Sequence, residues 1–177
     1  MLTSATMKNL ILMRHAKSAW DDPQQKDIDR PLSPRGRKAA SHMGEWLEGE
    51  GYRPSVVLCS TARRTRDTLE LLRPHLPKSA AVEFVSGLYM AAPREMLTEI
   101  GKVPAAAQCV MLLGHNPGMG SLAGLLAGGG DEKALGAMHG KFPTAAIAVL
   151  GFNVGKWSEV APGAGILRAF MRPRDLE

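Results

Sequence analysis

The chain has 177 residues, a formal net charge of +5 and 45% hydrophobic residues. These values predict an ordinary globular protein with a sizeable core. The modest positive charge favours anionic ligands but does not indicate nucleic acid. The few aromatic residues are not interleaved with basic residues, so we expect no nucleic-acid partner.

The N-terminal segment contains only a short apolar run, Leu10–Met13. This run is too short for a secretory segment or a membrane span, so we expect a cytoplasmic protein without a membrane partner. We expect residues 1–6 to be a disordered extension before Met7, and residues 7–177 to form a single domain.

The two cysteines, Cys59 and Cys109, each lie in an apolar, strand-like run. We interpret both as reduced, buried residues that act as small hydrophobic side chains. Neither forms a metal-ligand pattern with the histidines, so we expect no metal and no cofactor.

Strand-like and helix-like patterns alternate along the chain, which is typical of an α/β fold. A polar stretch, residues 20–30, separates the first expected strand from the first expected helix. Ser33 precedes Pro34 at the start of that helix, which ends near Gly49. Residues 128–130 are three consecutive glycines and predict a flexible break. The expected strands are 8–14, 55–59, 81–85, 108–113, 145–152 and 165–171, with a short one near Trp157; the other expected helices are 61–72, 93–100 and 118–126.

Three expected strands end in polar residues: Arg14-His15, then Ser60 to Arg64, then Gly114-His115. In open α/β sheets, ligands bind outside the carboxyl ends of the strands. We therefore expect these three segments to converge on one crevice.

His15 is the candidate nucleophile, because a neutral imidazole can attack phosphorus and form a covalent phosphohistidine. An isolated histidine is more often a structural residue, but His15 directly follows Arg14 at a strand end. The planar guanidinium of Arg14 can bind two phosphoryl oxygens at once. Phosphoryl transfer depends on positioning and on charge neutralisation, so a second cation is expected.

The segment 60–68 supplies that second cation, Arg64. The spacing of Ser60, Arg64 and Thr68 predicts that all three share one helix face. Arg64 falls in the first turn of this helix, where a basic residue opposes the helix dipole and a bound anion is favoured. Arg63 and Arg66 are interpreted as a solvated basic face.

His115 lies in Gly-His-Asn-Pro-Gly, after the most hydrophobic expected strand. Gly114 allows close approach of the backbone to a ligand. His115 could stabilise charge on a phosphoryl group, whereas alone it would more often be a turn residue.

Arg14-His15-Ala16 resembles the Arg-His-Gly signature of the histidine phosphatase superfamily, whose fold is that of phosphoglycerate mutase. The similarity extends through four further segments: 17–20, 30–36, Ser60-x-x-x-Arg64-x-x-x-Thr68, and Gly114-His115. The chain's short length and its Arg-His-Ala-Lys-Ser sequence are most similar to the SixA-type phosphohistidine phosphatases.

This resemblance implies a three-layer α/β/α sandwich around a mostly parallel sheet. It implies that His15 is the phosphorylated nucleophile and that Arg14, Arg64 and His115 form the phosphate pocket. It also implies that Ser18 donates a further hydroxyl group to the phosphate and that no metal takes part.

The chain departs from the family pattern at two places. Ala16 replaces the usual glycine, and the segment 85–90 lacks the glutamate that many members use as a proton donor. Glu83 lies within an expected strand, and Tyr89, with an ordinary pKa of about 10, would be a weak donor at neutral pH. Because imidazole leaves with little help, we expect phosphohistidine or a related phosphoramidate to be a better substrate than a sugar phosphate.

The short loops predict an open pocket that admits a side chain of another protein. The expected partner is a phosphorylated protein of the histidine-phosphotransfer type, or a small phosphorylated substrate. Three alternatives stay open at this point: a small phosphomonoester or nucleotide phosphatase, a phosphate-binding module without turnover, and an unrelated α/β domain.

Overall fold

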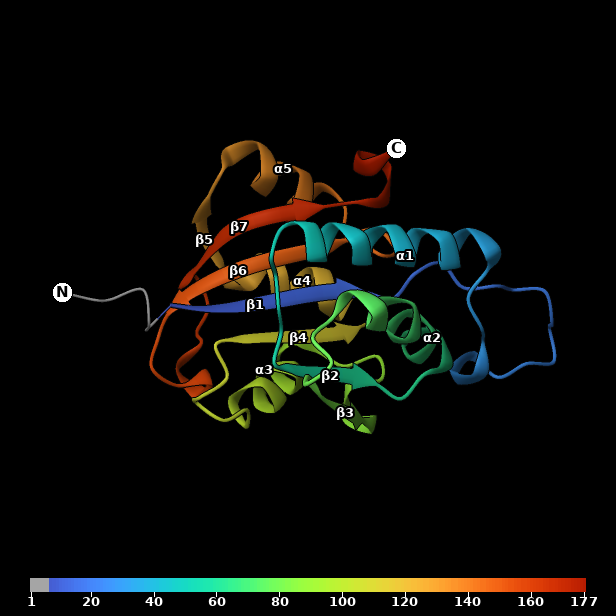
Figure 1. The fold of residues 1–177 in the computed structure, drawn as a ribbon, viewed down its shortest axis with the longest axis horizontal. Coiled ribbons are helices and arrows are strands. Elements are labelled where there is room, and N and C mark those ends of the chain that lie inside the picture. The colour runs from blue at the N-terminus through green and yellow to red at the C-terminus, as the bar shows by residue number, and fades with distance from the viewer. Residues whose placement is uncertain (1–6) are drawn as a thin grey trace.

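The computed structural model describes residues 7–177, and the predicted disorder of residues 1–6 lies outside this range. Its centre is one seven-stranded sheet with the order β3-β2-β4-β1-β6-β7-β5 (Figure 1). The strands are β1 (Met7–Arg14), β2 (Val56–Ser60), β3 (Ala81–Val85), β4 (Cys109–Gly114), β5 (Ala127–Gly130), β6 (Ile147–Asn153) and β7 (Gly165–Met171).

Most neighbouring strands are parallel. β1, β4, β2 and β3 pair in parallel, as do β5 and β7, whereas β6 runs antiparallel to both of its neighbours. β1 lies between β4 and β6, and its residues Leu10 to Met13 are fully buried. Strands covered on both faces read as continuous apolar runs, which is why this segment was recognisable as a strand.

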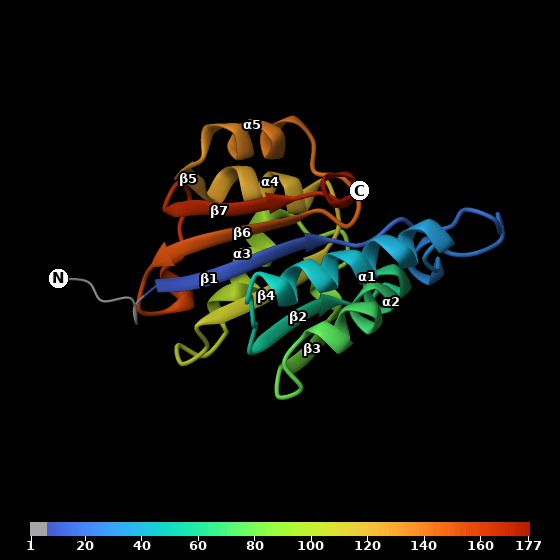
Figure 2. The same ribbon diagram turned by 45° about the horizontal axis from the view of Figure 1, so that its top comes forward.

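Helices cover both faces of the sheet (Figure 2). One core joins the sheet to α1 and α2, and a second core joins the opposite face to α3, α4 and α5. The predicted three-layer α/β/α sandwich with a mostly parallel sheet is therefore confirmed. The helices are α1 (Pro34–Gly49), α2 (Arg63–Leu72), α3 (Pro93–Gly101), α4 (Gly118–Leu126) and α5 (Glu132–Gly140); short 3-10 turns are η2 (Asp27–Asp29), η3 (Arg73–His75), η4 (Ser86–Leu88), η5 (Trp157–Glu159) and η6 (Pro173–Leu176).

The start of α1 follows the predicted pattern. Ser33 caps the helix by accepting a hydrogen bond from the Gly36 amide, and Pro34 is the first helical residue. A side chain at position 36 would collide with the carbonyl group of Lys17, so glycine is needed where α1 packs against the chain that leaves β1. The amide and hydroxyl groups of Ser33 also donate to the Lys17 carbonyl.

Two local predictions were wrong, and one helix was missed. Residues 128–130 belong to β5, because an edge strand beside β7 satisfies the backbone of a glycine run. Helix α5 was missed, although Asp131 caps it by accepting from the Ala134 amide. The segment at Trp157 is a 3-10 turn, in which the indole donates to the Ala107 carbonyl. Of the two cysteines, Cys59 is buried as predicted, whereas Cys109 is half-buried.

Candidate active site

The three polar strand ends lie together at one edge of the sheet. Arg14, the last residue of β1, is in register with Gly114, the last residue of β4, and the His15 amide donates to the Gly114 carbonyl. Ser60 ends β2 beside them. The ring centroids of His15 and His115 are 5.4 Å apart.

A cavity of about 500 Å³ opens at this edge. Its lining includes all five residues that the sequence singled out, namely Arg14, His15, Ser18, Arg64 and His115. The tertiary structure thus brings the predicted residues to one place, whereas their chemical roles stay predictions.

His15 is held as a neutral imidazole. Its Nδ1 lies 2.7 Å from the Ala16 carbonyl oxygen, which can only accept, so Nδ1 carries the proton and Nε2 keeps its lone pair. Burial lowers the pKa of His15 to about 4, and the nearby guanidinium groups of Arg64 and Arg14 act in the same direction. At neutral pH this ring therefore presents an unprotonated nitrogen.

The backbone beside His15 is anchored by α2. The Ala16 amide donates to the hydroxyl oxygen of Thr68 at 3.0 Å, and this hydroxyl donates to the Arg64 carbonyl at 2.7 Å. Arg64 lies in the first turn of α2, as predicted. The prediction that Ser60 shares this helix face was wrong, because α2 begins only at Arg63 and Ser60 belongs to β2.

Ser60 instead fixes the ring of His115. Its hydroxyl oxygen accepts weakly from the Ala62 amide at 3.4 Å and lies 2.7 Å from Nε2 of His115. If the hydroxyl proton points to Nε2, the proton of His115 lies on Nδ1. Burial, followed by the charge of Arg64, lowers the pKa of His115 to about 3, so this ring is also neutral.

Two polar atoms of the site are buried without a hydrogen-bond partner among the described residues: Nδ1 of His115 and Nε of Arg14. Buried donors in native proteins normally have partners, so unpaired ones call for an explanation. Nε of Arg14 is a donor, and Nδ1 of His115 is a donor in the tautomer in which Ser60 donates to Nε2. In that tautomer the two donors suit a bound oxyanion, which offers several acceptor oxygens.

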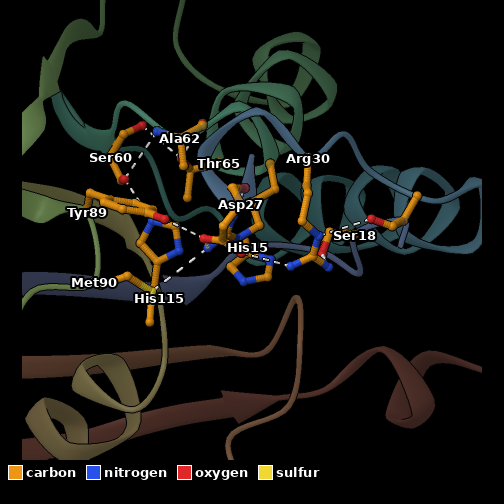
Figure 3. A network of polar contacts seen from close by, with 12 residues as sticks. His15, Ser18, Asp27, Arg30, Ser60, Ala62, Thr65, Tyr89, Met90 and His115 are labelled. Carbon is orange, nitrogen blue, oxygen red and sulfur yellow. Dashed lines mark hydrogen bonds and ion pairs between the residues drawn. The ribbon is translucent and has the colours of Figure 1, made fainter. Parts of the chain in front are cut away.

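Asp27 is the main residue that sequence reasoning missed. Its carboxylate accepts from Tyr89, from Nη1 of Arg30 at 3.0 Å and from Nη2 of Arg64 at 3.0 Å, as Figure 3 shows in part. Partial burial alone would raise the pKa of Asp27, but the bonds from Tyr89 and Arg30 and the charge of Arg64 lower it to about 2. The hydrogen bond between Tyr89 and Asp27 also raises the pKa of the Tyr89 hydroxyl.

Arg30 was also missed as a site residue. It is buried, donates to the Ala19 carbonyl at 3.1 Å and to the Ser18 hydroxyl oxygen at 2.5 Å, and lies over the ring of Trp20. Ser18 accepts from Arg30 (Figure 3) and lines the cavity, so its own proton stays available for donation. The sequence held one signal for Arg30, its place at the start of the segment 30–36, but none that separated Asp27 from its acidic neighbours Asp21, Asp22 and Asp29.

The described part of the chain contains no group of three or more histidine, cysteine or acidic side chains placed to hold a metal ion. Among residues 7–177, no helix is both long and apolar enough to cross a membrane.

Comparison with known proteins identifies the family. Residues 10–88 match the model of the histidine phosphatase superfamily, branch 1. An uncharacterized protein of Mycobacterium tuberculosis (strain ATCC 25618 / H37Rv) is 40% identical over 164 residues, which cover 92% of this chain and all of that protein. The chain belongs to the histidine phosphatase superfamily.

Solved structures place it in the SixA-type branch of this superfamily. A candidate phosphohistidine phosphatase SixA from Nakamurella multipartitia superimposes with a TM-score of 0.82 and 32% identity, covering 94% of this chain and 96% of that one. A candidate SixA from Agrobacterium tumefaciens gives a TM-score of 0.77 and 30% identity, with coverages of 94% and 98%. A SixA protein histidine phosphatase complexed with tungstate shares the fold at a TM-score of 0.72 and 24% identity, with coverages of 96% and 99%.

Proposed function

We propose that this member of the superfamily is a metal-independent phosphatase that removes the phosphoryl group from phosphohistidine in a protein. The observation that carries the proposal is the state of His15. It is a neutral imidazole whose Nδ1 is held by the Ala16 carbonyl, beside two guanidinium groups. The solved SixA structures named above support the substrate class.

The reaction proceeds in two displacements. Nε2 of His15 attacks phosphorus and a new N–P bond forms, while the P–N bond of the substrate breaks and its electron pair stays on the leaving nitrogen. The substrate ring carries a proton on its other nitrogen, so it leaves as a neutral imidazole. Arg14 and Arg64 neutralise the charge on the transferred group, while Nδ1 of His115 and the hydroxyl of Ser18 donate to its oxygens. Water then attacks the phosphorus of phospho-His15, which releases inorganic phosphate and restores the imidazole.

The leaving group decides which substrates react well. Asp27 is the only carboxyl group among the described residues that line the cavity, and with a pKa of about 2 it has no proton to give at neutral pH. An alkoxide needs a proton from the site as it leaves, whereas a phosphohistidine ring protonated on its other nitrogen leaves as neutral imidazole, whose conjugate acid has a pKa of about 6.5, and needs no proton from the site. The site therefore suits a P–N bond better than the ester bond of a sugar phosphate.

A substrate panel tests this proposal. Hydrolysis of a phosphohistidine peptide, glucose 6-phosphate and p-nitrophenyl phosphate is measured side by side, and the phosphoenzyme is sought as an acid-labile, alkali-stable species. We expect the peptide to have the highest kcat/KM and the label to be on His15. Faster hydrolysis of glucose 6-phosphate would overturn the substrate class, and turnover without a phosphoenzyme would overturn the covalent mechanism.

The histidine-phosphotransfer type of partner and the cytoplasmic location stay predictions. If the protein is instead a phosphatase of small phosphomonoesters, kcat/KM in the same panel should be higher for the two esters than for the phosphohistidine peptide. A binding module without turnover would bind phosphate and hydrolyse none of the three compounds.

A further inference from the structure

A second hollow continues from the mouth of the phosphoryl cavity. Lys17, Pro143 and Thr144 line both hollows, and Arg35, Arg172 and Arg174 complete the basic side of the second. These residues come from the chain after β1, from the start of α1, from the segment before β6 and from the C-terminal η6, which packs beside α1. We call this second hollow the basic groove.

Most cations of this region are unpaired. Lys17, Arg35 and Arg174 of the groove and Lys141 of the cavity form no ion pair with any described residue, and all four are exposed. Arg172 differs, because Asp175 holds its guanidinium with two hydrogen bonds of 2.9 Å. The described lining of the groove contains no carboxylate. The charges of Lys17, Arg35 and Arg174 are thus not matched by an ion pair within residues 7–177.

The cavity mouth also carries exposed apolar side chains. Trp20, 76% exposed, and Met90, 50% exposed, both line the cavity. Exposed Trp and Met side chains are enriched where proteins bind proteins, and a small polar phosphate compound would gain little from them. A protein surface explains both the apolar rim and the unpaired cations.

From this juxtaposition we propose that the basic groove docks an acidic segment of the protein that carries the phosphohistidine. The proposal rests on the proposed function, because docking serves the delivery of that phosphoryl group to His15. Carboxylates of the partner pair with Arg35, Arg174 and Lys17, while its apolar side chains contact Trp20 and Met90. Such long-range attraction raises the rate of encounter and decreases with added salt.

Charge reversal in the groove tests the proposal. The double variant Arg35→Glu, Arg174→Glu is compared with Lys78→Glu, Lys156→Glu, which changes two exposed lysines outside both hollows and alters the net charge equally. The substrates are two phosphohistidine peptides of equal length, one flanked by glutamates and one by serines, and Nα-acetylphosphohistidine.

We expect the groove variant to lower kcat/KM for the glutamate peptide by about 10-fold, because each reversal replaces an attraction by a repulsion. The same variant should leave the other two substrates within about twofold, and 0.5 M salt should remove most of the difference. The control variant should change no substrate by more than about twofold.

Other outcomes separate the two proposals. If the wild type hydrolyses none of the three compounds, the proposed function and the docking proposal both fail. If it hydrolyses both peptides and the groove variant treats them alike, only docking fails. Docking also fails if the groove variant lowers kcat/KM for Nα-acetylphosphohistidine as much as for the glutamate peptide, since the loss would then not depend on contacts with a partner segment.

Discussion

Two parts of the phosphoryl site differ in how their side chains are stabilised: one contains buried, neutral imidazoles, and the other contains charged side chains that pair with one another. We call the lining residues His15 and His115, together with Ser60 and Thr68 behind them, the floor, and the lining residues Trp20, Asp27 and Arg30 the wall. Every floor residue is buried and follows or supports a central strand. The wall lies in the loop between β1 and α1, which projects beyond the carboxyl end of β1 in Figure 1. Arg30 of the wall is buried, whereas Trp20 is exposed and the side chain of Asp27 is 45% exposed.

The difference between the buried imidazoles of the floor and the partly exposed carboxylate of Asp27 has a chemical consequence. On the floor, burial keeps two imidazoles neutral. The Ala16 carbonyl places the proton of His15 on Nδ1, and the Ser60 hydroxyl places that of His115 on Nδ1 when it donates to Nε2. On the wall, charged side chains neutralise one another within a network around Asp27. We infer that the floor supplies the chemistry and that the wall adjusts how strongly anions are bound. The following predictions test that division, from the largest expected effect to the smallest.

Replacement of His15 by alanine removes the nucleophile of the floor. We expect kcat for a phosphohistidine peptide to fall on the order of 10³-fold or more, because no other described group offers the covalent route. The matched control, His139→Ala, changes an exposed histidine outside the cavity and should keep full activity. Wild-type activity in the His15 variant would refute the nucleophile assignment.

Acid should lower the free energy of unfolding, because protonation of the two floor histidines, His15 and His115, favours the unfolded chain. The pKa values of His15 and His115 are about 4 and 3 in the folded protein, whereas the ordinary value is near 6.5. Between about pH 6.5 and the folded pKa of each ring, the unfolded chain binds a proton on that ring and the folded chain does not. Stability is therefore lost as pH falls below about 6.5, by up to about 1.4 kcal/mol per pH unit for each ring. Asp27 adds to the loss below about pH 4, because the folded chain resists protonation of this carboxylate as well.

Urea unfolding at a series of pH values between 7 and 4.5 measures this slope. The variant His115→Gln should have a shallower slope than the wild type, whatever its stability at pH 7. An unchanged slope would show that the His115 ring is not held neutral by burial.

Replacement of Ser60 by alanine tests the tautomer of His115. Without the hydroxyl, Nε2 of His115 has no partner to fix the proton on Nδ1, and we expect kcat to fall about 10-fold with little change in KM. The comparison variant Ser55→Ala removes an exposed hydroxyl at the other end of β2 and should be silent. A change in KM alone would place Ser60 in substrate binding instead.

Replacement of Asp27 by asparagine tests the wall. The amide oxygen can still accept from Nη2 of Arg64, so the guanidinium stays in place while a negative charge beside the cavity is removed. We expect the inhibition constant of inorganic phosphate to be about threefold lower for the variant than for the wild type, because the anion no longer meets this negative charge. The control is Asp29→Asn, which lies in the same 3-10 turn but outside the cavity lining. Equal inhibition constants for the wild type and both variants would show that Asp27 does not affect anion binding.

The floor was far more predictable from sequence than the wall. Arg14-His15 and Gly114-His115 follow apolar runs, and the carboxyl ends of parallel strands meet at one edge. Asp27 and Trp20 lie in a polar stretch without periodicity, where no local pattern separates a site residue from a solvated one. The strand β5 was missed for a related reason, since a glycine run has no side chains to reveal its pairing with β7.

The sequence by itself determined the α/β alternation, the N-terminal cap of α1 and the positions at which Arg14, His15, Arg64 and His115 stand. These features depend on hydrophobic periodicity and on local hydrogen bonds, which a short stretch of chain encodes. Only the tertiary structure decided that Ser60 serves His115, that Asp27 lies against Arg64, and that Lys17 joins the cavity to the basic groove. The two side-chain contacts join residues 55 and 37 positions apart, so packing of the whole sheet rather than neighbouring sequence decides the partners.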